Sequence, residues 1–308
     1  MKILAILLLF IVVTSFGLKE LGFAQSLDYS NAPILMTVED VEKTLKDENR
    51  LIVDVRKEGY ASGHIPGAIS FDMELLIDKE HPVEGHLIQE EAFEKIMREH
   101  GVNNDQTVII YDQGRETDAT RLFYALEYFG HKDVRVLDGG FTAWEAANKK
   151  TETQTFDAER GDFSAKENRE LRMEKEEVKQ VIGKENVVLL DVRSPGEYKG
   201  EDVRSKRGGH IPSAVNLEWT NVLTEEDVSR FKSADEIETL LEAEGVKKDK
   251  KVVVYCQKAN RASHMYFTLR LLGYEDLSVY EGSWEEWGND PKTPIIDPSK
   301  VNRELRSL

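Results

Sequence analysis

Short apolar runs alternate with longer segments of helical periodicity along most of the chain. Three runs are short and nearly continuous, as buried parallel strands are: RLIVDV (50–55), TVIIYD (107–112) and DVRVLD (133–138). Three further segments place apolar residues at helical spacing, and the last two of them end at a glycine: VEDVEKTLK, EEAFEKIMREHG and DATRLFYALEYFG. We therefore predict an α/β fold in which helices flank both faces of a parallel sheet.

The pattern of the first half returns in the second half. Two matched pairs are MTVEDVEKTLKDENRLIVDVR (36–56) with MEKEEVKQVIGKENVVLLDVR (173–193), and GHIPGAI (63–69) with GHIPSAV (209–215). Two more are VIIYDQG (108–114) with VVVYCQK (252–258), and FGHKDVRVLDGGFTAW (129–144) with LGYEDLSVYEGSWEEW (272–287). The offset stays near 137–146 throughout, so the chain contains two copies of one unit.

The repeat divides the chain into segments. We predict one domain over 30–148 and a second over 172–290, joined by a polar linker over 149–171 that is poor in apolar residues. The tail, 291–308, carries no pattern from which a structure follows. Because both domains belong to one chain, we expect the protein to be a monomer.

The N-terminus differs from the rest of the chain. Lys2 is followed by the apolar run ILAILLLFIVVTSFGL and then by small residues at Gly22, Ala24 and Ser26. This pattern predicts a signal peptide over 1–26, and an uncleaved anchor is the alternative. The folded part is then exported, to the periplasm or the extracellular space. We expect no stable membrane association after cleavage.

Composition and charge narrow the class of protein. Hydrophobic residues make up 40% of the chain, enough to build real cores. The net charge is −17, which argues against nucleic acid and anionic membrane surfaces as partners.

The chain contains a single cysteine, Cys256, so it forms no internal disulfide. Such a thiol is either reactive or buried and inert. Cys256 directly follows the run KVVVY (251–255), at the carboxyl end of a predicted parallel strand. Ligands of open α/β sheets bind outside the carboxyl ends of the strands, which favours the reactive alternative.

The residues after Cys256 predict a loop that binds an anion. CQKANR (256–261) separates the strand from a predicted helix, ASHMYFTLRLLG (262–273). A loop that leads into a helix N-terminus directs several backbone N–H groups inward, and Lys258 and Arg261 add positive charge. These surroundings favour the thiolate of Cys256, which would act as a nucleophile.

With these residues the chain resembles the tandem-domain rhodaneses, sulfurtransferases of the thiosulfate and 3-mercaptopyruvate type. The resemblance covers 34–290 and rests on DVR, GHIPGA and GHIPSA, YCQKANRAS, and the endings DGGFTAW and EGSWEEW. It implies that Cys256 takes the outer sulfur of a donor as a persulfide and passes it to a thiophilic acceptor, cyanide or a thiol, without a cofactor. Four residues separate Cys256 from Arg261, whereas related phosphatases and arsenate reductases have five.

The charged loop favours thiosulfate as the donor, because mercaptopyruvate enzymes of this family tend to have an uncharged Cys-Gly-Ser-Gly loop. Arg261 and Lys258 suit the sulfonate oxygens, and Gln257, Ala259 and Asn260 complete the predicted substrate-binding loop. Ala259 stands where the family often has glycine. The alternatives are a 3-mercaptopyruvate sulfurtransferase, a non-enzymatic persulfide carrier, and a structural module with an inert thiol.

Supporting residues follow the strand that should lie beside the cysteine strand. Either Glu197 or Asp191 orients Arg261, or Asp191 and Arg193 form a purely structural ion pair. Neither His81 nor His86 has a cysteine or third ligand nearby, so we predict no metal site.

The first copy carries Asp112 where the second carries Cys256. A carboxylate carries no sulfur and repels thiosulfate, so we expect the first domain to be catalytically silent and to cover the cleft. The second copy has an insertion with Arg204, Lys206 and Arg207, which either draws in a dianion or is a solvated loop.

Overall fold

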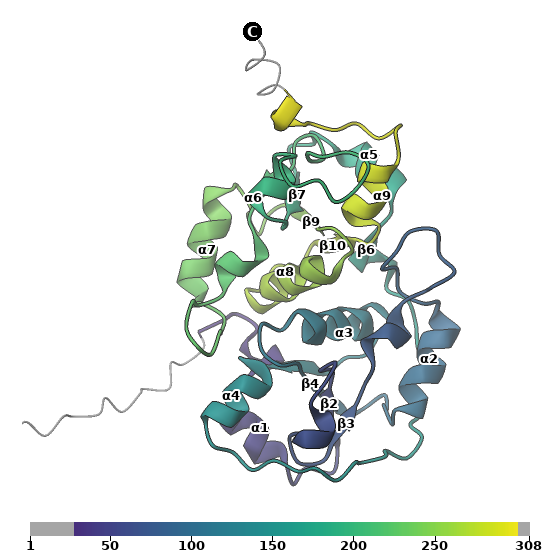
Figure 1. Cartoon of the computed structure of the whole chain (residues 1–308), viewed down its shortest axis with the longest axis vertical. Helices are drawn as coiled ribbons and strands as arrows, with labels where there is room; N and C mark the ends of the chain where they lie inside the picture. Colours follow the sequence, from purple (N-terminus) through teal and green to yellow (C-terminus); the bar gives the residue numbers. More distant parts are fainter. Residues whose placement is uncertain (1–27, 301–308) are drawn as a thin grey trace, which may run out of the picture.

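Two five-stranded sheets form the framework of the chain in a computed structural model whose described residues are 28–300 (Figure 1). The first sheet has the order β1-β5-β4-β2-β3, and the second has the matching order β6-β10-β9-β7-β8. Every pairing between named strands is parallel. The α/β fold expected from the sequence is confirmed, with one sheet in each copy of the repeat.

The strands are short and their bounds agree closely with the apolar runs. Those of the first sheet are β1 (Leu35–Met36), β2 (Arg50–Asp54), β3 (Ala68–Ser70), β4 (Thr107–Tyr111) and β5 (Val134–Leu137). Those of the second are β6 (Arg172–Met173), β7 (Val187–Asp191), β8 (Val215–Asn216), β9 (Lys251–Tyr255) and β10 (Leu277–Tyr280). The edge strands β1, β3, β6 and β8 are too short to give a clear pattern in the sequence.

Helices cover both faces of each sheet. The α-helices are α1 (Val38–Thr44), α2 (Glu90–Glu99), α3 (Thr117–Tyr128), α4 (Gly140–Ala146), α5 (Lys175–Val181), α6 (Pro195–Tyr198), α7 (Ala234–Ala243), α8 (Asn260–Leu271) and α9 (Ser283–Asn289). Short 3-10 turns are η1 (Ala32–Ile34), η2 (Tyr60–Ser62), η3 (Met73–Leu76), η4 (Arg169–Leu171) and η5 (Trp219–Val222). In the first domain α1 and α4 pack on one face, whereas α2 and α3 pack on the other.

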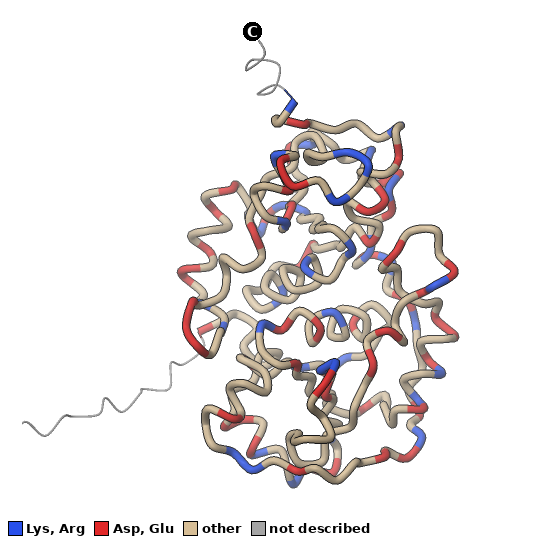
Figure 2. Tube along the Cα trace, in the orientation of Figure 1, with Lys and Arg blue, Asp and Glu red and all other residues tan. Residues whose placement is uncertain are grey.

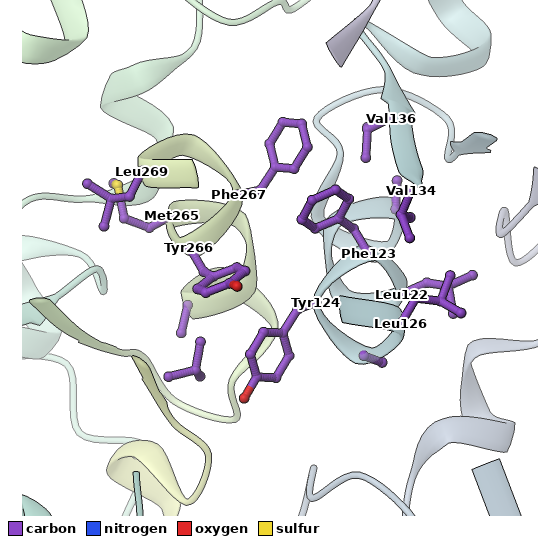
Figure 3. Close-up of a cluster of buried hydrophobic side chains, with 14 of the residues drawn as sticks. Leu122, Phe123, Tyr124, Leu126, Val134, Val136, Met265, Tyr266, Phe267 and Leu269 are labelled. Carbon is purple, nitrogen blue, oxygen red and sulfur yellow. The ribbon is translucent and has the colours of Figure 1, made fainter. Parts of the chain in front are cut away.

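Helices α3 and α8 lie side by side where the two domains meet (Figure 1). Phe123 meets Phe267 edge to face at 4.8 Å between ring centroids, and Tyr124 meets Tyr266 at 5.1 Å (Figure 3). These side chains belong to one buried cluster that includes residues of both sheets. Because α8 begins directly after the cysteine loop, this packing holds that loop against the first domain.

Two buried carboxylates join the domains in a reciprocal way. Asp138, after β5, accepts the Phe231 N–H of the second domain at 3.1 Å. Glu281, after β10, accepts the Leu87 N–H of the first domain, also at 3.1 Å. Glu281 also pairs with Arg121 of α3, and both side chains are almost fully buried. The relative position of the domains is therefore fixed by polar as well as apolar contacts.

The segments that follow each domain pack back onto it. Glu152 forms an isolated antiparallel bridge with His64, and Ile296 forms the same bridge with His210. The described part of the tail, to residue 300, thus repeats for the second domain what the linker does for the first. The predicted signal peptide, 1–26, and residues 301–308 lie outside the described residues.

Charged positions of both signs are interspersed over the two domains (Figure 2). Within 28–300, no helix is long and apolar enough to span a bilayer.

Candidate active site

Cys256 follows β9, the strand between β10 and β7 in the second sheet, and only 1% of the residue is exposed. Helix α8 begins at Asn260, two residues before the predicted start at 262. The loop is therefore tighter than expected: Cys256 to Ala259 are non-helical, whereas Asn260 and Arg261 lie in the first helical turn. The Asn260 N–H donates to the Lys258 carbonyl at 3.0 Å, and the N–H groups of Arg261 and Ala262 have no acceptor within the helix.

The carbonyl groups of the loop are anchored on α9. Trp284 N–H donates to the Cys256 carbonyl and Glu285 N–H to the Gln257 carbonyl, each at 2.9 Å. No peptide bond in the described chain is cis, so the N–H that follows each carbonyl points the opposite way, into the loop. Helix α9 thus orients the loop as an anion cradle.

Ser283 holds the cysteine itself. Its hydroxyl accepts the Cys256 N–H at 3.2 Å and donates to the Tyr280 carbonyl at 2.9 Å. Ser283 adopts a φ of 49°, a left-handed conformation that is uncommon for serine, and the first copy has Gly140 at this position. Our sequence analysis missed Ser283; this replacement of glycine within EGSWEEW was the available signal.

The equivalent loop of the first domain surrounds a carboxyl group, that of Asp112. The Asp112 carboxylate accepts four backbone N–H groups: Gly114 at 2.8 Å, Glu116 and Asp118 at 3.2 Å, and Ala119 at 3.4 Å. Burial raises the pKa of Asp112, and these hydrogen bonds oppose the rise. The N–H groups of this loop therefore converge on one side chain, at the position where the second domain has Cys256.

Arg261 is oriented by Glu197, one of the alternatives from the sequence. The guanidinium donates to both carboxylate oxygens, at 2.7 and 2.9 Å. Burial acts to raise the pKa of Glu197, but the hydrogen bonds and charge of Arg261 outweigh it and lower that pKa to about 2. Two of the five N–H donors of Arg261 are used in this pair, so three remain for a ligand.

Asp191 pairs with Arg193 instead. Arg193 Nε lies 2.9 Å from Asp191 Oδ1, and the guanidinium lies 4.4 Å from the Trp284 ring centroid. The first domain repeats the arrangement with Asp54 and Arg56, 3.0 Å apart. Because the pair is present in both domains, including the one without a cysteine, we assign it a structural role. In the second domain it supports α9.

The other loop residues have different surroundings. The Gln257 amide donates to Ser205 at 3.0 Å and to Glu285 at 2.9 Å, on the α9 side of the loop. Lys258 forms an ion pair with Glu84 of the first domain. Ala259 is fully buried with a φ of 65°, which explains why glycine suits this position.

Two adjoining cavities open beside the loop, and the first domain supplies most of their walls. One, of about 450 Å³, is lined by Lys258 and Asn260 together with Glu74, Ile77, Asp78, Lys79, His81, Glu84 and Gly85. The other, of about 610 Å³, shares Glu74, Ile77 and Asn260 with it and reaches Arg121. No pattern in the sequence indicates which first-domain residues line these cavities.

The basic insertion is held against α9. Arg207 donates to the carbonyls of Trp287 at 2.7 Å and Thr293 at 2.9 Å. Arg204 pairs with Asp202 at 2.9 Å and lies 3.7 Å from Glu197, whereas Lys206 is exposed. Arg207 is thus a structural residue, and only Arg204 and Lys206 are placed to attract an anion.

The histidines of the first domain do not assemble a metal site. His81 and His86 stack at 3.8 Å between ring centroids, and burial lowers the pKa of His86 to about 4. Over residues 28–300, no three His, Cys, Asp or Glu side chains gather as metal ligands would.

Comparison with known proteins identifies both copies of the repeat. The family described as "Rhodanese-like domain" matches residues 37–147 and 174–290. The chain is 36% identical over 282 residues to the sulfur carrier protein TtuD of Thermus thermophilus, covering 87% of this chain and 98% of the relative. It is 31% identical over 269 residues to the thiosulfate sulfurtransferase of Azotobacter vinelandii, with the same coverage.

A solved structure leads to the same family. The 3-mercaptopyruvate sulfotransferase of Escherichia coli superposes with a TM-score of 0.74 at 29% identity, covering 82% of this chain and 98% of that one. The chain belongs to the rhodanese family, as a sulfurtransferase with two tandem rhodanese-like domains.

Proposed function

We propose that the protein transfers sulfane sulfur from thiosulfate to a thiophilic acceptor through a persulfide on Cys256. The observation that carries this proposal is the loop at Cys256, where α9 binds the Cys256 and Gln257 carbonyls so that the N–H groups that follow them point into the loop. The equivalent loop of the first domain is one residue longer, and it surrounds the Asp112 carboxyl group with four N–H donors. A persulfide anion needs the same kind of site.

The chemistry takes two steps. The Cys256 thiolate attacks the outer sulfur of thiosulfate, a new S–S bond forms, and the S–S bond of the donor breaks. Sulfite leaves with the electron pair, and the terminal sulfur of the persulfide faces the N–H groups of the loop. The acceptor then attacks this terminal sulfur and releases the Cys256 thiolate. With cyanide as acceptor the product is thiocyanate.

The charge of the loop supports thiosulfate over 3-mercaptopyruvate. Arg261 keeps three N–H donors beyond its pair with Glu197, and the Cys256 charge contributes to raising its pKa, so the guanidinium lies within electrostatic reach of the sulfur. Thiosulfate presents a dianion to this site, whereas mercaptopyruvate presents one carboxylate. Relatives at similar identity include thiosulfate and mercaptopyruvate sulfurtransferases, and one is named a sulfur carrier.

The donor is tested by steady-state kinetics with cyanide as acceptor. We expect a higher kcat/KM for thiosulfate than for 3-mercaptopyruvate. The reverse order would replace this proposal with the mercaptopyruvate reaction. A persulfide that forms but turns over only slowly with cyanide and small thiols would indicate a carrier.

We further propose that the first domain is catalytically silent, because Asp112 already occupies its cradle. Its role is then to supply most of the walls of the cavities at Lys258 and Asn260, next to the Cys256 loop.

Export is also a proposal, supported by the apolar N-terminal run and the small residues that follow it. We expect the mature protein to begin after Ala24 or Ser26, in the periplasm or outside the cell, as a monomer. N-terminal sequencing of the protein from fractionated cells and sedimentation of the purified chain check these expectations.

A further inference from the structure

A segment of the first domain lies directly on the cysteine loop. At Gly85, which has a φ of 88°, an added Cβ would lie 3.0 Å from both the Cβ and the carbonyl oxygen of Lys258. The Gly85 carbonyl accepts a hydrogen bond from Arg121 at 2.8 Å, and Leu87 N–H is bound by Glu281. The segment is therefore fixed at both sides of its contact with the loop.

This contact places Glu84 against the cation of the loop. The Glu84 carboxylate accepts a hydrogen bond from Lys258 Nζ, and both residues line the 450 Å³ cavity. The pair stays accessible, with 45% of the Lys258 side chain and 72% of the Glu84 side chain exposed. The positive charge of Lys258 is therefore already partly neutralised by Glu84 when a sulfur donor enters the cavity.

We propose that Glu84 is a specificity-determining residue, which opposes the charge of Lys258 and so lowers the preference of the site for dianionic donors. The inference rests on the proposed sulfurtransferase function. Because Glu84 belongs to the first domain, that domain sets the donor preference of a cysteine in the second.

The proposal has a quantitative signature. Glu84 acts on a donor by direct repulsion and by holding the Lys258 ammonium away from it. Both Coulomb energies are proportional to the donor's charge, so the logarithm of the combined effect should be about twice as large for a dianion as for a monoanion. The effect should also shrink as salt is added, because both residues are accessible to solvent. A structural role would change the two donors alike and would persist in salt.

The test compares Glu84→Gln with wild type in low salt. We expect kcat/KM to rise about three- to tenfold for thiosulfate and about two- to threefold for 3-mercaptopyruvate, from the charge argument. Glu80→Gln is the matched control, since Glu80 lies in the same segment but does not line the cavity, and it should leave both values unchanged. Equal effects of Glu84→Gln on both donors, or none, would overturn the inference.

A double-mutant cycle with Lys258→Met tests whether Glu84 acts through Lys258. The gain from Glu84→Gln should become smaller in the Lys258→Met background, because only the direct repulsion of the donor remains. An undiminished gain would contradict a role through Lys258.

Anion binding separates this inference from the proposed function. Sulfate, a dianion, and methanesulfonate, a monoanion, can be titrated by calorimetry without turnover. Glu84→Gln should tighten sulfate binding more than methanesulfonate binding. If wild type forms a persulfide but Glu84→Gln leaves both affinities unchanged, the inference is wrong and the function stands. If no persulfide forms, the sulfurtransferase proposal and the donor preference built on it are wrong together, whatever the anions show.

Discussion

Arg261 is held in place beside Cys256 by a single buried carboxylate. Glu197 forms no hydrogen bond with Cys256, but it accepts hydrogen bonds from two of the five N–H donors of Arg261. Three donors therefore remain for a ligand. Glu197 is itself fixed by Ser194, whose N–H and hydroxyl both donate to it at 3.2 Å. The orientation of Arg261 therefore depends on a chain of contacts that starts in α6.

Replacing Glu197 with Gln should affect both activity and stability. The substitution removes one charge-assisted hydrogen bond to Arg261. We therefore expect kcat/KM for thiosulfate to fall about tenfold, the size of effect expected from the loss of one such bond. At pH 7 the free energy of unfolding should fall by about 2 kcal/mol, because the carboxylate has a lowered pKa. Cyanide-coupled kinetics and urea unfolding measure the two effects, with exposed Glu201→Gln as the control.

The stability effect of Glu197 has a defined pH dependence. The pKa is about 2 in the folded protein and near 4.5 in the unfolded chain. The unfolded chain therefore binds the proton first as pH falls, and the contribution present above pH 4.5 disappears as pH falls toward 2. A stability difference between wild type and Glu197→Gln that stays constant from pH 7 to pH 2 would contradict this assignment.

At the scale of elements, the Cys256 loop and the Asp112 loop of the first domain are supported in the same way. In each, a strand ends at the loop, the N-terminus of a helix supplies N–H groups, and a second helix anchors the carbonyls. In the first domain Phe141 N–H binds the Asp112 carbonyl at 2.8 Å, as Trp284 does for Cys256. The loops share these supports but differ in the group at the centre and in length, because the helix N-cap lies four residues after Asp112 and three residues after Cys256.

The variant Asp112→Asn tests whether the loop of the first domain is dispensable for the chemistry at Cys256. The amide keeps one acceptor but brings an NH₂ group against backbone N–H groups, so we expect a loss of about 1–3 kcal/mol of stability. Persulfide formation at Cys256 should remain, because the cradle of the second domain is untouched. A folded Asp112→Asn protein that takes up no sulfur would contradict a silent first domain.

At the scale of the molecule, the domains share one core and one buried ion pair. Arg121 and Glu281 come from different domains, and Arg121 also donates to Ser263 of α8 at 3.3 Å. Removing one partner leaves the other charge buried and unpaired, which is costly. The wild-type chain should therefore unfold as one cooperative unit.

Arg121→Met should destabilise the chain by about 3–5 kcal/mol, the range for breaking a buried pair. The double variant Arg121→Met, Glu281→Gln should recover part of this loss because no unpaired charge remains. Calorimetry measures both, and it should show one transition for wild type. Two separate wild-type transitions, or a double variant no more stable than Arg121→Met, would contradict the account of the interface.

The sequence predicts the features that depend on local patterns and misses those that depend on contacts between distant parts of the chain. The central strands, the helices and the Cys256 loop follow from local periodicity and from the repeat, and Glu197 was one of two residues expected to orient Arg261. Ser283, Glu84 and the Arg121–Glu281 pair were not predicted. They act across loops or between domains, where the partner lies far away in the chain and leaves no local pattern. The early start of α8 was missed because Asn260 and Arg261 read as loop residues.

The central claim is that Cys256 carries sulfur, and intact mass of the purified protein after thiosulfate tests it most directly. We predict a gain of one sulfur atom in wild type, no gain in Cys256→Ser, and loss of the added mass as thiocyanate when cyanide is supplied. No gain in wild type, or the same gain in Cys256→Ser, would contradict the account.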